Sequence, residues 1–271
     1  LTHPLVYDRD SDTLRPVAWE QAFARIGEIL RGLQPDEVEF YTSGRASNEA
    51  AWLFQLFARE YGTNNFPDCS NMCHESTSVG LPQSIGIGKG TVSLDDFDQT
   101  ELVISIGHNP GTNHPRMMGT LHELSRRGVP IIVFNPLRER ALERFADPQN
   151  VMEMATRRST PIASTYYQVR AGGDAAALKG IAKALLQLEE EQGQVLDHAF
   201  IAQHTQGFTA FADDLHATRW QDIEQESGLT RESLTQVAAA YAKSRATIVT
   251  YGMGITQHNK GTSNVRLIAD L

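Results

Sequence analysis

Short apolar runs alternate with longer stretches of helical periodicity along most of the chain. The runs expected to be strands are residues 38–42, 102–106, 129–134 and 247–251. Apolar positions spaced as on one face of a helix occur at residues 48–61, 114–127, 174–191 and 231–243. Strands separated by helices are typical of βαβ units, so the pattern predicts an α/β fold with a Rossmann-like parallel sheet and flanking helices.

The chain is expected to contain parts of two domains. Residues 1–68 would belong to a first α/β domain and residues 69–271 to a Rossmann-like domain, because Gly, Asn, Pro and Asp cluster between them. The polar stretch 142–167 is interpreted as a long surface loop or insertion. The chain lacks an initiator Met and ends in an apolar run without a helix stop signal. We therefore expect a fragment of a larger protein, with the second domain truncated at its C-terminus.

Composition and charge narrow the function classes. The 271 residues carry a net charge of -9 without a block rich in Lys and Arg, so a nucleic-acid partner is not expected. No apolar run reaches the roughly 18 residues that a membrane span needs. No signal peptide is visible. The sequence therefore predicts no membrane span in this fragment and a cytoplasmic location.

The two cysteines, Cys69 and Cys73, have the spacing C-x3-C without a second pair to complete a zinc or iron–sulfur site. Cys69 is interpreted as structural. Cys73 is followed by His74, and a thiolate can be a nucleophile or a soft metal ligand beside a group that moves protons near neutral pH. Two buried free thiols would satisfy the same count.

Polar loops rich in small residues follow the predicted strands. They comprise residues 42–49, 107–114, 135–138 and 252–257, with a further candidate at 171–174 before a helix. Ligands of open parallel sheets bind beyond the carboxyl ends of the strands, and glycines and helix N-termini accommodate phosphates. Each loop alone could be only a turn or a helix cap. Together they favour a large phosphate-bearing ligand, and Asn135 could hydrogen-bond to its ribose or base.

Residues 71–81, preceded by 61–65, resemble the metal-ligand segment of formate dehydrogenase catalytic subunits, where a selenocysteine or cysteine precedes His. The resemblance continues through the segments 107–110, 114–115, 131–136, 172–174 and 251–257. Residues 5–20 are similar to the stretch that follows the iron–sulfur domain of these proteins. The chain is therefore identified as resembling the molybdopterin oxidoreductase family, in its cysteine-containing, formate dehydrogenase-like branch of alpha subunits.

The resemblance implies a Mo or W ion held by two molybdopterin guanine dinucleotides, with Cys73 as a further metal ligand and His74 as the proton acceptor. A 4Fe–4S cluster would lie outside this fragment. The residues that the resemblance places against the cofactor are Asn109, Thr112, Asn113, Asn135, Asp174, Gly252, Gly254 and Gln257. The full-length protein would oxidise formate or a similar small substrate by two electrons and pass them to an acceptor protein or domain.

The departures from the family concern the substrate more than the cofactor. Glu75 and Ser76 replace a common Gly-Pro pair, and Thr112 and Asn135 replace common Asp residues. The catalytic Arg of the family lies beyond Leu271, so the isolated fragment is expected to be inactive. Two alternatives remain at this point: a Cys–His hydrolase or transferase with Cys73 as nucleophile and His74 as base, and a non-catalytic α/β binding module.

Overall fold

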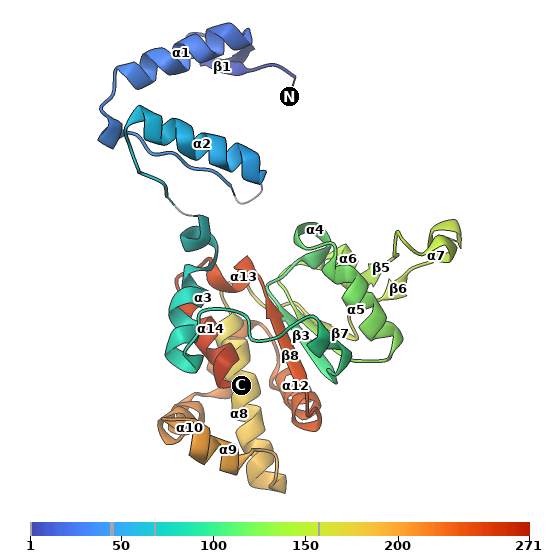
Figure 1. Cartoon of the computed structure of the whole chain (residues 1–271). Coiled ribbons are helices and arrows are strands. Elements are labelled where there is room, and N and C mark those ends of the chain that lie inside the picture. The colour runs from blue at the N-terminus through green and yellow to red at the C-terminus, as the bar shows by residue number, and fades with distance from the viewer. Residues whose placement is uncertain (1, 44–45, 68, 157) are drawn as a thin grey trace. The chain divides into compact units, whose positions relative to one another are not determined.

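The computed structural model describes residues 2–43, 46–67, 69–156 and 158–271, with only the backbone for residues 69–72 (Figure 1). Packing within the chain divides it into two units, Leu1–Met72 and Cys73–Leu271. The boundary expected after residue 68 concerns domains of the whole protein and stays a prediction.

The first unit is a β-hairpin followed by helices. Its elements are β1 (Leu5–Asp8), β2 (Thr13–Pro16), α1 (Trp19–Arg31), the 3-10 turn η1 (Pro35–Glu37) and α2 (Asn48–Tyr61). The helix predicted at residues 48–61 is confirmed. It begins where the Ser47 side chain accepts a hydrogen bond from the Ala50 amide, and it ends at Gly62 in the left-handed conformation.

The strand predicted at residues 38–42 was wrong. This segment is not part of a β-ladder in the described residues of the unit, where the hairpin of β1 and β2 is the sheet. It instead pairs with Asn65, whose carbonyl accepts from the Phe40 amide at 2.9 Å and whose side chain donates to the Val38 carbonyl at 3.3 Å. An apolar run becomes a strand only where a neighbouring strand satisfies its backbone.

A four-stranded parallel sheet organises the second unit. Its strands are β3 (Leu102–Ile106), β4 (Ile131–Phe134), β7 (Thr165–Tyr167) and β8 (Thr247–Tyr251), in the order β7-β4-β3-β8. The chain adds strands on one side of β3 and then returns to its other side with β8. The order therefore reverses between β3 and β8, the place where open α/β sheets bind ligands. The predicted fold class is confirmed.

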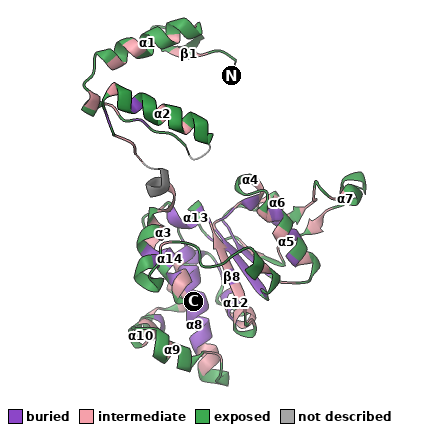
Figure 2. Ribbon diagram, viewed as in Figure 1, coloured by how far each residue is buried: buried purple, intermediate pink, exposed green. Residues whose placement is uncertain are grey.

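Helices cover both faces of this sheet. Side chains of a strand alternate between the two faces, and all five residues of β3 are buried, so both faces must be covered. Ile104 and Ile106 pack against Leu178 and Ile181 of α8 (Asp174–Gln192). The same layer contains α12 (Arg231–Lys243) and α14 (Gly261–Asp270). Val103 points to the opposite face, where it packs with α5 (Met117–Arg126). The buried residues are concentrated in β3, β4 and α8, whereas β8 is mostly of intermediate burial (Figure 2).

Residues 142–167 do not form one structureless loop, which corrects that part of the interpretation. The segment includes the end of α6 (Arg140–Glu143), β5 (Arg144–Phe145), α7 (Val151–Thr156), β6 (Thr160–Pro161) and β7. Leu142 and Ile162 are fully buried. Strands of two or three residues are too short to show a period in the sequence. Whether the segment is an insertion stays a prediction.

Further elements complete the second unit. They are α3 (Cys69–Ile85), η2 (Asp95–Asp98), α4 (Pro110–Asn113), α9 (His198–His204), α10 (Phe208–Ala217), α11 (Trp220–Ser227) and α13 (Met253–Thr256). Of these, α3, α11 and α13 contribute to the core around α8. Across the described residues, no helix combines the length and apolarity that crossing a bilayer requires.

Candidate functional site

The backbone of Cys73 is held at the carboxyl edge of the sheet. His74 is non-helical (φ -136°, ψ 23°), so α3 is kinked immediately after Cys73. The Thr256 hydroxyl donates to the Cys73 carbonyl oxygen at 2.6 Å, and the Ser76 hydroxyl donates to the Thr256 carbonyl oxygen at 2.8 Å. Thr256 ends α13, which directly follows β8. Cys73, a half-buried free cysteine, therefore lies beside the end of β8.

His74 is connected to the same strand through two hydroxyl groups. Its Nδ1 atom lies 3.5 Å from the Thr77 hydroxyl, which lies 3.1 Å from the phenol oxygen of Tyr251, the last residue of β8. Burial raises the pKa of the Tyr251 phenol, so this group stays protonated at neutral pH. These contacts and the Thr256 hydrogen bond bring Cys73 and His74, the two predicted catalytic residues, to the carboxyl end of β8.

The loops after β3 and β8 pack backbone against backbone. Gly107 has a left-handed φ of +56°, and its carbonyl accepts a hydrogen bond from the Gly254 amide at 3.1 Å. A Cβ at Gly254 would lie 2.7 Å from the Gly107 carbonyl oxygen, and one at Gly252 would lie 3.0 Å from the same atom. Gly252 and Gly254 therefore have a packing requirement of their own, whatever ligand they face.

The loop from Asn109 to Asn113 is closed by its own side chains. The Asn109 side chain accepts from the Thr112 amide at 3.3 Å and so caps α4, and the Asn113 side chain donates to the Asn109 carbonyl at 3.3 Å. Thr112 and Asn113 are exposed. These three sequence-predicted residues share one turn beyond the end of β3, the strand at which the sheet order reverses.

A pair made of buried His108 and exposed His114 spans the same loop. The His108 Nε2 atom lies 2.9 Å from His114 Nδ1, while His108 Nδ1 is buried without a hydrogen-bond partner in the described part of the chain. An orphaned N–H costs more than an orphaned lone pair, so we assign the proton of His108 to Nε2. Burial, assisted by the charge of His114, lowers the pKa of His108 to about 4.

Asn135 and Asp174 lie beyond β4 and β7. Asn135 is buried directly after β4, and its amide donates to the Tyr167 carbonyl at 3.1 Å. Asp174 is buried in the first turn of α8 and lines a small cavity together with Ile106. Burial raises the pKa of the Asp174 carboxyl, an effect opposed by His258, whose Nε2 lies 3.9 Å from Oδ2.

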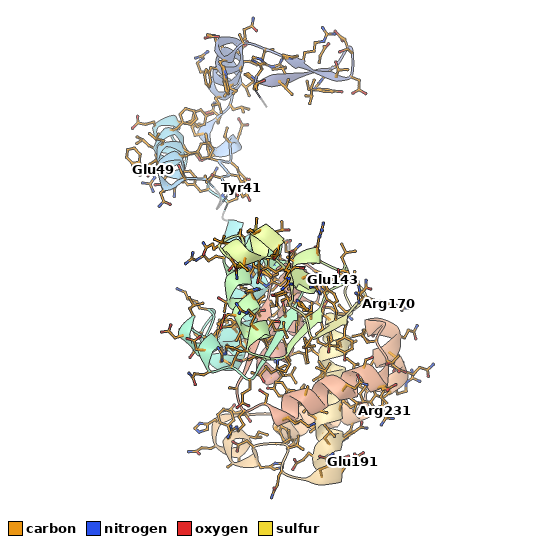
Figure 3. The ribbon with its side chains drawn as sticks, turned by 90° about the vertical axis from the view of Figure 1, so that its right-hand side faces the viewer. Tyr41, Glu49, Glu143, Arg170, Glu191 and Arg231 are labelled. Atoms are coloured by element: carbon orange, nitrogen blue, oxygen red, sulfur yellow. The ribbon has the colours of Figure 1, made fainter. Side chains whose placement is uncertain are left out.

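Gln257 and Arg138 lie in the segments that follow β8 and β4. Gln257 is exposed at the end of α13, where its amide donates to the Met253 carbonyl at 2.9 Å. The Arg138 guanidinium donates to Glu143 of α6, which is labelled in Figure 3, at 2.7 Å. It also lies 5.4 Å from the centre of the Tyr166 ring. Arg138, which follows Asn135 in the chain, therefore has two partners within the protein, Glu143 and Tyr166.

Comparison with known proteins identifies the family. The family profile described as molybdopterin oxidoreductase matches residues 1–271. The chain belongs to the molybdopterin oxidoreductase family. The resemblance inferred from residues 71–81 and the strand-end loops is thus confirmed at the level of the family.

Relatives of this molybdopterin oxidoreductase chain include two proteins of Escherichia coli K12. Protein YdeP is 55% identical over 100% of the chain and 36% of its own length, and formate dehydrogenase H is 27% identical over the same shares. The solved structure of acetylene hydratase from Pelobacter acetylenicus has a TM-score of 0.60 at 18% identity, covering 99% of this chain and 34% of its own, and supports the fold. The chain spans about a third of the length of these relatives.

The family implies a molybdopterin cofactor with Mo or W, and the residues of the second unit fit such a group. A half-buried free thiol at Cys73 is the soft ligand that such a metal accepts. The buried Asn135 and Asp174 side chains and the unpartnered Nδ1 of His108 lie beyond the carboxyl ends of the strands. Buried polar groups at the reversal of strand order fit a cofactor rich in hydrogen-bonding atoms.

Sequence reasoning did not single out the residues that hold Cys73 and His74 in place. Ser76, Thr77, Tyr251 and Thr256 all lie in or beside segments recognised as polar loops or strand ends. Their partners, however, are about 180 positions away in the chain. A polar residue in a turn signals a hydrogen bond, but its partner becomes known only when the sheet is assembled.

The His108 pair predicts a specific pH dependence of stability. His108 stays neutral in the folded molybdopterin oxidoreductase chain down to about pH 4, whereas an unfolded histidine binds a proton near pH 6.5. The unfolded state therefore holds more protons between these values, and the free energy of unfolding should fall as pH falls through this window. We expect denaturant unfolding of wild type to lose about 3 kcal/mol more than that of His108→Gln between pH 7 and pH 4. Equal losses in the two proteins would contradict the assignment.

Proposed function

We propose that the second unit forms part of a bis-molybdopterin guanine dinucleotide site in the full-length protein, with the Cys73 thiolate as a ligand of Mo or W. The observation that carries the proposal is the attachment of Cys73 to α13, at the side of the sheet where the strand order reverses. Ligands of open α/β sheets bind at this place, and the family supplies a cofactor of suitable size.

The substrate that the site residues favour is formate or a similarly small molecule. Support comes from the Cys73–His74 pair, whose segment resembles formate dehydrogenases, and from the 27% identity to formate dehydrogenase H. When bound, the cofactor supplies the two-electron redox change of the reaction. The chain's own contribution is a soft thiolate, a proton acceptor beside it and loops that orient the ligand.

His74 is the group that would receive the substrate proton. Its Nδ1 faces the hydroxyl of Thr77, which is in turn within hydrogen-bonding distance of Tyr251. In the tautomer whose Nδ1–H donates to the Thr77 hydroxyl oxygen, the Nε2 atom has the free lone pair and would accept the proton. Fixing one ring nitrogen by a hydrogen bond sets the tautomer and the orientation of a catalytic imidazole.

The remaining site residues divide into loop contacts and buried contacts. Asn109, Thr112 and Asn113 would contact the guanine dinucleotide from the loop after β3, and Gln257 from the end of α13. Gly252 and Gly254 would let backbone amides approach it. Asn135 and Asp174 would bind its polar groups from buried positions beyond β4 and in the first turn of α8. Electrons would leave through a 4Fe–4S cluster elsewhere in the protein to an acceptor protein or domain, as the resemblance of residues 5–20 suggests.

Metal and pterin analysis of the purified full-length protein tests the proposal. We expect about one Mo or W per chain with about two molybdopterins, and reduction of an artificial electron acceptor when formate or a related small acid is added. A protein that contains neither metal would overturn the proposed cofactor site. A metal-loaded protein inactive on formate but active on another small molecule would correct the substrate alone.

A further inference from the structure

We infer that Thr256 is a positioning residue for Cys73, acting through the reciprocal hydrogen bonds that it makes with Cys73 and Ser76. This inference rests on the proposed role of Cys73 as a metal ligand. The helix α3 is kinked at His74, and a non-helical residue disrupts the helical hydrogen bond to the carbonyl just before it. Thr256 donates to that carbonyl at 2.6 Å, so a residue of α13 satisfies the Cys73 backbone.

Thr256 makes two hydrogen bonds to α3. The Thr256 hydroxyl donates to the Cys73 carbonyl, and the Thr256 carbonyl accepts from the Ser76 hydroxyl at 2.8 Å. One residue of α13 thus contacts α3 on both sides of the kinked residue His74. Thr256 is buried, so water does not compete well for either bond. Two bonds on either side of a kink fix the direction in which the Cys73 side chain leaves the backbone.

Backbone packing at Gly261 and Gly80 leaves little space around these two hydrogen bonds. A Cβ at Gly261 would overlap the Thr256 carbonyl oxygen and would lie 2.5 Å from the Ser76 hydroxyl. A Cβ at Gly80 would lie 3.1 Å from the carbonyl oxygen of Thr262. Close backbone approach at two glycines therefore holds α3 against the segment that follows α13.

The consequence concerns the metal rather than the stability of the fold. Groups that orient a metal ligand change metal affinity or activity by about 10- to 100-fold when they are removed. Loss of the Thr256 hydroxyl should leave the sheet and its helices intact. It should allow the Cys73 backbone to move, and so alter the environment of a metal bound to its sulfur.

The experiment compares variants of the full-length protein by two measurements. Hydrogen exchange of the peptide around residues 73–80, measured on metal-free protein, reports on the backbone contact. The electron paramagnetic resonance of the partly reduced, metal-loaded protein, in its Mo(V) or W(V) state, reports on the metal. For Thr256→Val we expect exchange to be about tenfold faster and the metal signal to shift. For Thr256→Ser, which keeps the hydroxyl, we expect wild-type behaviour in both.

A steric variant provides an independent route to the same change. Gly261→Ala should displace the Thr256–Ser76 contact and reproduce the effects of Thr256→Val, whereas Gly119→Ala is a matched control, since a Cβ there meets nothing within 4 Å. Ser76→Ala removes one of the two bonds and should give a smaller shift in the same direction. Circular dichroism establishes that each variant is folded.

The outcomes separate this inference from the proposed function. If Thr256→Val and Gly261→Ala keep the wild-type metal signal while Cys73→Ala changes it, Thr256 does not position the ligand and the proposed function stands. If Cys73→Ala leaves the metal signal unchanged, Cys73 is not a ligand, and both the proposed function and the inference are overturned.

Discussion

Cys73→Ala in the full-length protein is expected to reduce turnover by more than about a hundredfold, because the substitution removes a direct ligand of the metal. Loss of a group that only orients a metal ligand lowers metal affinity or activity by about 10- to 100-fold. Loss of the ligand itself should therefore have a larger effect. The fold should persist, since Cys73 is half-buried and its structural contact is made by the backbone carbonyl, which alanine retains. Steady-state kinetics at saturating substrate measure the loss.

A neighbouring residue of the same helix supplies the control. Ser78 is exposed on α3, so Ser78→Ala should keep turnover within about twofold of wild type. If Cys73→Ala also kept wild-type turnover at full metal loading, the thiolate would have no part in catalysis. Cys73 would then be a free thiol without a role in the reaction, the alternative that the cysteine count leaves open.

Gly107→Ala is expected to lower the free energy of unfolding by about 3 kcal/mol. The left-handed φ of +56° strains any residue with a side chain, at a cost of roughly 1–2 kcal/mol. In addition, the new methyl group would lie 2.9 Å from the carbonyl carbon of Gly254, and overpacking of this kind costs about 1–3 kcal/mol. Denaturant unfolding of the 271-residue chain, followed by fluorescence, measures the difference.

Two further glycines separate the contributions of strain and packing. Gly128 has a φ of +80° but open space around its Cβ position, so Gly128→Ala should cost only about 1 kcal/mol. Gly119 has neither constraint and should tolerate alanine. A Gly107→Ala variant no less stable than Gly128→Ala would show that the loops after β3 and β8 do not pack as closely as described.

The core strands and helices of the second unit are the part of the fold that the sequence predicts well. Residues 102–106 and 247–251 are apolar runs that end at glycines, and both are strands with the expected bounds. The helix at 231–243 is likewise as expected, because Thr230 caps its first turn. Each of these elements carries its own signal, so local rules are sufficient.

Other elements depend on partners that are distant in the chain. Residues 38–42 have the composition of a strand but not the neighbour that would pair with them, and the three residues of β7 are a strand only because β4 lies beside them. The strand order that brings the loops together is likewise a property of the assembled sheet.

The candidate site shows the same division. Resemblance to a family singles out Cys73 and His74, because the order and spacing of several motifs carry that signal. It does not show that Thr256, more than 180 positions away, makes the hydrogen bond that locates the Cys73 backbone. Nor does it show that Gly252 and Gly254 are required for loop packing, since that requirement appears only in the distances to Gly107.

X-ray absorption at the metal edge of the full-length protein shows whether the sulfur of Cys73 binds the metal. We expect a Mo or W ion whose shell of sulfur neighbours includes one from the protein, and the loss of about one sulfur neighbour in Cys73→Ser at unchanged pterin content. Identical sulfur shells in wild type and Cys73→Ser, both fully loaded with metal, would contradict it.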